Sequence, residues 1–111
     1  METFQTLLTE KISQSGLQDL QLCQKANLSR QQFLKVRGTG VPSKRDLLSL
    51  LTALELPLSD MEAILRAAGY DFQEDSPFDC ILKYYISQGV FHIYTINLTL
   101  FAYNQPQLGE S

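Results

Sequence analysis

Six of the nine Lys and Arg residues in this 111-residue chain lie in one short segment, residues 25–45, which contains no Asp or Glu. They are Lys25, Arg30, Lys35, Arg37, Lys44 and Arg45. Residues 46–111 carry a net charge of −7, so the formal net charge of −3 conceals the cationic segment. Grouped ammonium and guanidinium groups attract phosphate and other polyanions. The segment therefore predicts a surface that faces a polyanion; the alternative is a solvated charged face without a partner.

Groups suited to catalysis are sparse. The single histidine, His92, has apolar neighbours, which favours a partly buried structural residue over a general base. Asp71, Glu74 and Asp75 are more typical of a solvated turn than of a catalytic carboxylate pair. The sequence shows no Ser/His/Asp or Cys/His grouping, no phosphate-binding glycine loop and no metal-ligand spacing. We expect no enzymatic activity, no cofactor and no metal site.

Length and composition indicate one folded domain. A chain of 111 residues with 44% hydrophobic and 19% charged residues has the size and composition of a single globule. No apolar run approaches the roughly 18 residues of a membrane span, and the N-terminus does not resemble a signal peptide, so we expect a cytoplasmic protein without a membrane partner. Cys23 and Cys80 belong to no CxxC pattern, which predicts two buried thiols.

The apolar residues recur at steps of three and four, the period of an α-helix. This spacing predicts an all-α fold with helices over residues 3–14, 17–25, 29–37, 43–55, 59–68 and 76–88. Residues 90–103 are rich in β-branched and aromatic side chains, which favours a strand, but Ile93, Ile96 and Leu100 have helical spacing. Because a lone strand would leave its backbone groups unpaired, we expect a seventh helix over 93–103.

Four Ser residues precede an acid or amide by three positions, the pattern of a capping box at a helix start. The pairs are Ser29 with Gln32, Ser43 with Asp46, Ser59 with Glu62 and Ser76 with Asp79. Pro77 occupies the first helical position that proline prefers. Gly16, Gly69 and Gly89 follow helical stripes, where a left-handed residue ends a helix.

Residues 19–38 have the pattern of a helix-turn-helix. The small residue Cys23 lies midway along the first helix, where close helix crossing requires it. Asn27 occupies the turn position that needs a positive φ. The residues expected to pack inward are Leu22, Ala26, Leu28, Phe33 and Val36. An ordinary helical hairpin would share these requirements.

Residues 17–30 (LQDLQLCQKANLSR) resemble the second helix and turn of the lambda-repressor/Cro-like helix-turn-helix family. Val41-Pro42-Ser43 and residues 47–56 (LLSLLTALEL) resemble its fourth helix, and residues 58–65 (LSDMEAIL) its fifth. The remainder is similar to a C-terminal extension of a bacterial subgroup, whose members occur alone or fused to other domains, macro domains among them. The resemblance implies a single domain over 1–111: a five-helix lambda-repressor-like bundle (3–69), about two further helices (70–104) and a tail (105–111).

The resemblance also implies that helix 29–37 enters the major groove of double-stranded DNA in a transcriptional regulator. Carried over to this chain, the base-contacting residues are Ser29, Arg30, Gln31, Gln32 and Lys35. The phosphate-contacting residues are Gln18, Arg37, Lys44 and Arg45. About five phosphate contacts would give a slope of log affinity against log salt near −4 to −5. Leu34 departs from the family pattern, because a polar or small residue commonly faces DNA there; an exposed Leu would serve a thymine methyl or a protein partner.

Nine of the eleven aromatic residues lie between Tyr70 and Tyr103. One interpretation is that they enlarge the core; the other is that part of them forms a homodimer or partner interface. The interface set would be Tyr84, Tyr85, Phe91, Tyr94, Phe101 and Tyr103. This skew and Leu34 favour a second hypothesis for function, in which the chain is a protein-interaction or antitoxin-like adaptor module that keeps the fold without binding DNA.

Overall fold

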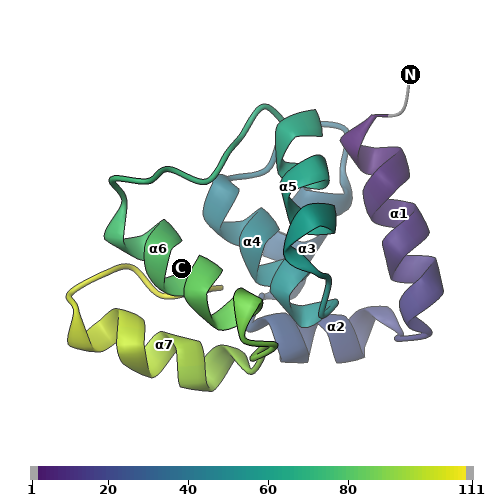
Figure 1. Cartoon of the computed structure of the whole chain (residues 1–111). Coiled ribbons are helices and arrows are strands. Elements are labelled where there is room, and N and C mark those ends of the chain that lie inside the picture. The colour runs from purple at the N-terminus through teal and green to yellow at the C-terminus, as the bar shows by residue number, and fades with distance from the viewer. Residues whose placement is uncertain (1–2, 110–111) are drawn as a thin grey trace.

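The structure, a computed structural model, describes residues 3–109, and all its regular elements are α-helices (Figure 1). The seven helices are α1 (Phe4–Ser15), α2 (Asp19–Ala26), α3 (Arg30–Arg37), α4 (Lys44–Ala53), α5 (Leu58–Ala67), α6 (Pro77–Ser87) and α7 (Ile93–Ala102). The all-α prediction is confirmed, and each helix lies within one or two residues of its predicted bounds. The ambiguous stretch forms α7, so the choice of a helix there is also confirmed.

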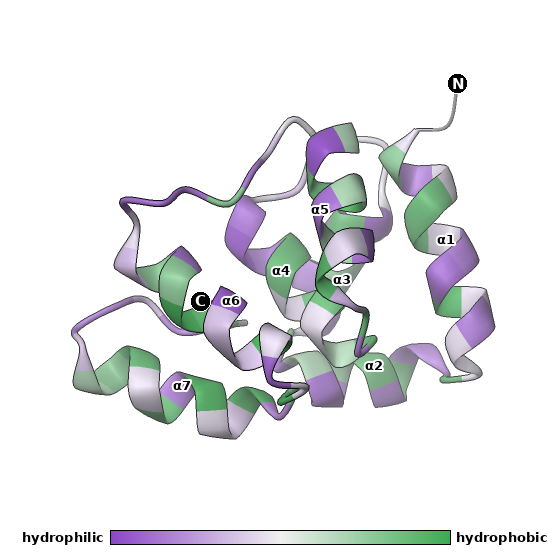
Figure 2. Cartoon of the chain, in the orientation of Figure 1, coloured by the Kyte–Doolittle hydropathy of each residue, from purple (hydrophilic) through white to green (hydrophobic). Residues whose placement is uncertain are grey.

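Helix α4 occupies the centre of the molecule. Every residue from Leu47 to Ala53 is buried, and α4 contacts α2, α3, α5 and α7. Its two buried hydroxyl groups are satisfied within the helix, because Ser49 Oγ donates to Arg45 O at 2.9 Å and Thr52 Oγ1 donates to Leu48 O at 2.7 Å. The two buried hydroxyl groups of α4 therefore leave no unpaired polar atom in the core. The neighbouring helices pack their hydrophobic residues against α4 (Figure 2).

The C-terminal helices extend the same core. Helix α6 contacts α5 and α7, and α7 contacts α4. The hydrophobic cluster of buried side chains runs from Leu8 in α1 through Leu82 in α6 and Ile96 in α7 to Leu108. Because these side chains share one cluster, the last two helices are packed onto the first five. None of the helices in residues 3–109 combines the length and the apolar character needed to cross a bilayer.

Three of the four predicted helix caps are present. Ser29 and Gln32 form a complete capping box, while the hydroxyls of Ser43 and Ser76 accept from the residue three positions on. The prediction for Ser59 is wrong. Helix α5 begins one residue earlier, at Leu58, with Pro57 at the N-cap, and the Pro57 carbonyl accepts from Asp60 N and Met61 N at 3.0 and 3.1 Å. Ser59 therefore lies inside the first turn, beyond the capping position.

The two thiols differ, which corrects the prediction that both are buried. Cys23 is buried in α2, whereas Cys80 is exposed on α6, where its thiol donates to Glu74 O at 3.3 Å. The inward positions of α6 are held by Asp79, Leu82 and Ile86. Cys80 follows Asp79 directly, so the helical period turns it toward solvent.

Residues 105–109 of the predicted tail pack against the rest of the fold. Residues 105–109 fold back from the end of α7 toward the middle of the molecule (Figure 1), and Leu108 is completely buried. The physical reason is a set of hydrogen bonds: Asn27 and Asn97 donate to Leu108 O, and Leu108 N donates to Asn97. We call residues 105–109 the C-terminal strap. Glu110 and Ser111, which the predicted tail and domain include, lie outside the described residues, as do Met1 and Glu2.

Candidate nucleic-acid interface

A tight turn joins α2 to α3. Asn27 ends α2 in the left-handed conformation, with φ 57° and ψ 36°, as the sequence predicted. The amide of Leu28 donates to Cys23 O at 2.9 Å, and Ser29 then caps α3. All the residues predicted to pack inward are buried: Leu22, Ala26, Leu28, Phe33 and Val36. The turn and its packing thus fix the direction in which α3 leaves α2.

The exposed side chains on the outer face of α3 include Arg30, Gln31, Leu34 and Lys35. Neither Arg30 nor Lys35 forms an ion pair with any residue between 3 and 109. Leu34 is 56% exposed, which confirms that this apolar side chain faces solvent on the same helix. One face of a capped helix therefore offers a guanidinium fork, a carboxamide, an ammonium group and an aliphatic side chain.

Ser29 and Gln32, the other two predicted base-contacting residues, form the N-terminal cap of α3. The Ser29 hydroxyl accepts from Gln32 N at 3.1 Å, and Gln32 Oε1 accepts from Ser29 N at 2.9 Å. Gln32 Nε2 also donates to Asp46 Oδ1 on α4 at 3.3 Å. Both ends of the Gln32 carboxamide are thus engaged within the protein, whereas Arg30, Gln31 and Lys35 of the predicted base-contacting set are exposed.

The predicted phosphate-contacting residues lie in different surroundings. Gln18 is exposed at the N-cap of α2, and the Arg37 guanidinium is 3.7 Å from Asp19 Oδ1 and 5.9 Å from the centre of the Phe33 ring. Arg45 is half-buried in the first turn of α4.

Lys44 points away from the outer face of α3. Its ammonium group is 2.6 Å from Oδ2 of Asp79 on α6, a carboxylate whose side chain is only 4% exposed. The same oxygen accepts from Gln73 N at 2.7 Å. Asp79 is buried and ionisable, so Lys44 supplies the charge that this carboxylate needs. No local pattern signals this pairing, since the two residues are 35 positions apart.

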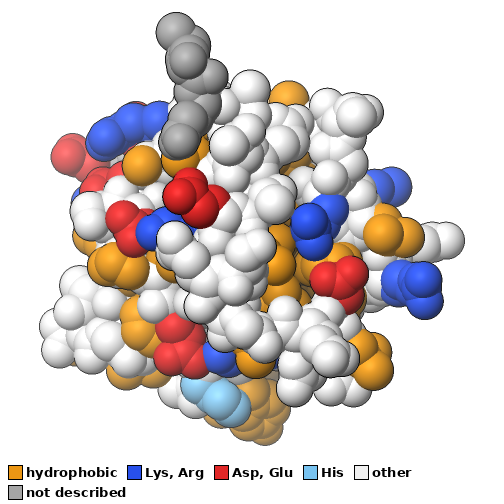
Figure 3. All heavy atoms as spheres, turned by 90° about the vertical axis from the view of Figure 1, so that its right-hand side faces the viewer, with side chains coloured by type: hydrophobic (Ala, Val, Ile, Leu, Met, Phe, Trp, Pro, Cys, Tyr) orange, Lys and Arg blue, Asp and Glu red, His pale blue; other side chains and the backbone are white. Residues whose placement is uncertain are grey.

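The cationic segment is therefore partly neutralised within the fold. Within residues 3–109, carboxylates hold at least three of its six cations, because Lys25 on α2 also pairs with Glu55. Figure 3 shows that Lys and Arg side chains gather toward its right-hand edge beside exposed hydrophobic atoms, while at its left they alternate with acidic side chains. The positive field of residues 25–45 is thus weaker than their charge count indicates.

Cys23 lies beneath this surface as a neutral thiol. Burial raises the pKa of the Cys23 thiol, the nearby Asp19 carboxylate raises it further, and Arg30 lowers it. Because the thiolate is the nucleophile, this environment makes Cys23 a packing residue. His92, predicted to be partly buried, is exposed at the N-cap of α7, with Nδ1 3.2 Å from Thr95 Oγ1.

The predicted aromatic interface divides into two groups. Tyr84, Tyr94, Phe101 and Tyr103 are 62%, 68%, 69% and 65% exposed. Tyr85 and Phe91 are half-buried against the core, and the Tyr85 hydroxyl is 2.5 Å from Thr99 Oγ1. Tyr85 and Phe91 thus enlarge the core as the first interpretation predicted, while the four exposed rings leave the interface a prediction.

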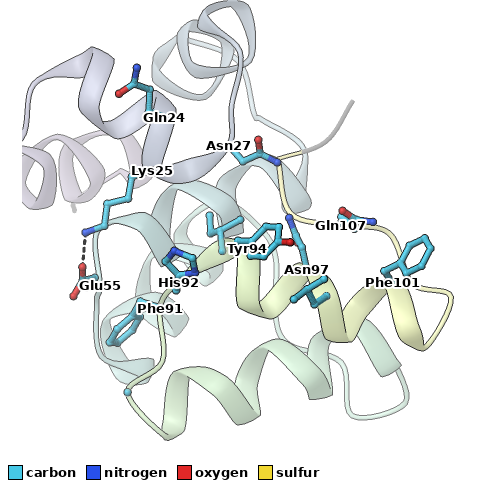
Figure 4. Close-up of a pocket in the computed structure, with 13 residues that line it drawn as sticks. Gln24, Lys25, Asn27, Glu55, Phe91, His92, Tyr94, Asn97, Phe101 and Gln107 are labelled. Carbon is cyan, nitrogen blue, oxygen red and sulfur yellow. Dashed lines mark hydrogen bonds and ion pairs between the residues drawn. The ribbon is translucent and has the colours of Figure 1, made fainter.

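A groove of about 650 Å³ separates α2 from α7 (Figure 4). Its lining includes Phe91, Tyr94 and Phe101, and the Lys25–Glu55 ion pair also borders it. The groove meets the α2–α3 turn at Asn27 and the C-terminal strap at Gln107.

Comparison of the chain with protein-family models, curated proteins and solved structures finds no match.

Proposed function

We propose that this protein binds double-stranded DNA and regulates transcription, with α2 and α3 acting as a helix-turn-helix of the lambda-repressor/Cro-like kind. The observation that carries the proposal is the outer face of α3, where Arg30, Gln31, Leu34 and Lys35 are exposed together. A helix of this width fits the major groove, where base edges display distinct patterns of donors and acceptors.

Each of these side chains has a base edge to which it is suited. The Arg30 fork matches the two acceptors of guanine, and the Gln31 carboxamide matches the donor and acceptor of adenine. Leu34 is suited to the methyl group of thymine. Lys35, one turn further along, reaches a guanine or a phosphate. Gln18, Arg37 and Arg45 would hold the backbone and fix the register of α3 in the groove.

The test begins with selection of a preferred duplex from a random pool. Affinities for that duplex and for random DNA are then measured for the wild type, Arg30→Ala and the control Lys83→Ala. Lys83 is exposed on α6, so its replacement removes a charge without touching α3. We expect Arg30→Ala to cost about 1–3 kcal/mol on the preferred duplex and less on random DNA. Equal losses of affinity on both duplexes would show that Arg30 does not recognise bases. Failure to select any duplex would refute the proposal.

A second candidate function rests on the outer face of α7. Tyr94, Leu98 and Phe101 are more than half exposed and lie at spacings of four and three residues, so they form one apolar stripe. Helix α7 contains no charged residue. An exposed stripe of this kind marks a protein-interaction surface, which an adaptor or antitoxin-like module would use without DNA.

The second candidate is tested by capture of partners from native lysate with and without nuclease, together with light scattering of the purified protein. Leu98→Lys places a charge within the stripe, and Leu20→Lys is the control, since Leu20 is 69% exposed on α2. If the stripe is an interface, Leu98→Lys abolishes the nuclease-resistant complex or the dimer, and Leu20→Lys leaves it intact. Equal behaviour of both variants and the wild type would refute this candidate.

A further inference from the structure

The C-terminal strap ends against the turn between α2 and α3. Leu108 O accepts two hydrogen bonds, from Asn27 Nδ2 at 3.1 Å and from Asn97 Nδ2 at 3.2 Å. Leu108 N donates to Asn97 Oδ1 at 2.7 Å. Figure 4 shows the Asn27 and Asn97 side chains reaching the strap from the end of α2 and from α7. Two residues thus join the backbone of the strap to the turn and to the last helix.

Gly109 continues this contact at closer range. It is buried with φ 73°, a conformation that L side chains rarely adopt. A Cβ atom at this position would collide with the carbonyl oxygens of Asn27 and Ala26. The backbone of Gly109 therefore packs directly on the backbone of the turn, an approach that only glycine allows.

The strap also borders the start of α3. Gly109 lines a small hollow together with Ser29 and Gln32, the capping pair of that helix. Asn27 is the left-handed residue that ends α2, and two residues separate it from α3. Any change in the backbone angles of Asn27 rotates α3 relative to α2. A contact that fixes Asn27 therefore fixes the angle at which α3 is presented.

We infer that the C-terminal strap is a positioning element for α3, with Asn97, Leu108 and Gly109 as its positioning residues. The role in DNA recognition rests on the proposed function above. The hydrogen bonds of Leu108 join the strap to Asn27 and Asn97, which lie outside α3. The strap acts through the turn, by holding α3 in the one orientation that suits the groove. Loss of this preorganisation lowers affinity and selectivity even though every base-contacting side chain is still present.

Two variants and a control test this inference in the full-length protein. Gly109→Ala introduces the Cβ that collides with the turn. Asn27→Gly keeps a residue that tolerates positive φ but removes the donor to Leu108 O. The control is Gly89→Ala, because Gly89 has φ 74°, and a Cβ there would meet no atom within 4 Å. The control thus carries the same backbone strain without the collision.

The first measurement is amide hydrogen exchange, which does not depend on DNA. We expect exchange at Leu28 and Phe33 to accelerate roughly tenfold in Gly109→Ala and Asn27→Gly, with amides of α5 unchanged and the control like wild type. Unchanged exchange at the turn in both variants would overturn the inference. Should Gly109→Ala fail to fold, Asn27→Gly decides the matter.

The second measurement is affinity for the preferred and for random duplexes. We expect both strap variants to lose roughly tenfold on the preferred duplex and less on random DNA, while the control binds like wild type. Faster exchange with unchanged binding would overturn the positioning role. If the wild type binds no DNA, the proposed function fails, and the exchange measurement alone decides whether the strap holds the turn.

Discussion

The cations of residues 25–45 differ in what holds them. Lys44 is paired with a buried carboxylate, whereas Arg30 and Lys35 project from α3 without an ion pair to any described residue. Removing Lys44 would leave Asp79 buried without its cation, a change that destabilises the fold. A loss of DNA binding in Lys44→Ala would therefore report on stability before it reported on a phosphate contact. Arg30 and Lys35 can be replaced without that complication.

The two cysteines provide a prediction at the scale of the residue. In the native protein, a thiol-specific reagent near pH 8 should modify Cys80 quickly and Cys23 slowly. Cys80 is exposed, while burial and the Asp19 charge raise the pKa of Cys23 and reduce its thiolate fraction. The rate at Cys23 should rise as the pH increases toward the raised pKa. Mass spectrometry of the labelled peptides distinguishes the two sites, and both should react alike in denaturant.

The raised pKa of Cys23 also makes the stability of the fold depend on pH. The folded state keeps the Cys23 proton to higher pH than the unfolded state does. The stabilisation that the protonated Cys23 thiol gives to the folded state is therefore complete at pH values below the thiol pKa of the unfolded chain. It is lost as the pH rises through the raised pKa of the folded state. Equal labelling rates for Cys23 and Cys80 in the native protein would contradict this description.

At the scale of the helices, the N-caps show where the local sequence was sufficient to predict a helix start. Ser29, Ser43 and Ser76 each accept from the amide three residues on, as the local pattern predicted. Ser59 has the same pattern but lies beyond the N-cap, because α5 begins at Leu58, one residue earlier than expected, with Pro57 at the N-cap. Proline has no N–H and favours helix starts. Two local signals for a helix start, Pro57 and Ser59, therefore lie within three residues, and the helix follows the proline.

This difference yields a prediction at the scale of the element. Ser76→Ala should lower the free energy of unfolding by about 1 kcal/mol, because it removes the acceptor for the Asp79 amide. Ser59→Ala should change it by no more than about 0.5 kcal/mol. Urea denaturation of both variants and the wild type provides the measurement. A loss for Ser59→Ala as large as that for Ser76→Ala would mean that α5 starts at Ser59 after all.

For the molecule as a whole, the distribution of ion pairs changes the expected salt dependence. Lys25 and Lys44 are held by Glu55 and Asp79, while the Arg37 guanidinium lies at the longer distance of 3.7 Å from Asp19. If the protein binds DNA as proposed, two to four cations would contact phosphates, fewer than the five that the sequence suggested. We expect the slope of log affinity against log salt to lie between about −2 and −3.6.

Titration of the preferred duplex from low to physiological salt measures this slope. A slope near −5 would show that the internal ion pairs open on binding. A flat response with retained affinity would contradict phosphate binding altogether. Asp19→Asn gives a sharper comparison, because it releases Arg37 and should raise affinity at low salt without changing the outer face of α3.

The helices and the α2–α3 turn were predictable from the sequence. Helical spacing, serine caps and the positive φ of Asn27 depend on residues within about four positions of one another, so a local pattern records them. The outward direction of Leu34 followed in the same way, as did the burial of Leu22 and Val36.

Only the tertiary structure decided which polar side chains remain available at the surface. Gln32 turns to Asp46, Lys44 to Asp79, and the strap returns 81 positions along the chain to Asn27. Such pairings form because a buried carboxylate, amide or backbone group must find a partner wherever the packed helices place one. Their partners are set by the packing of distant helices, which no spacing within a short segment encodes.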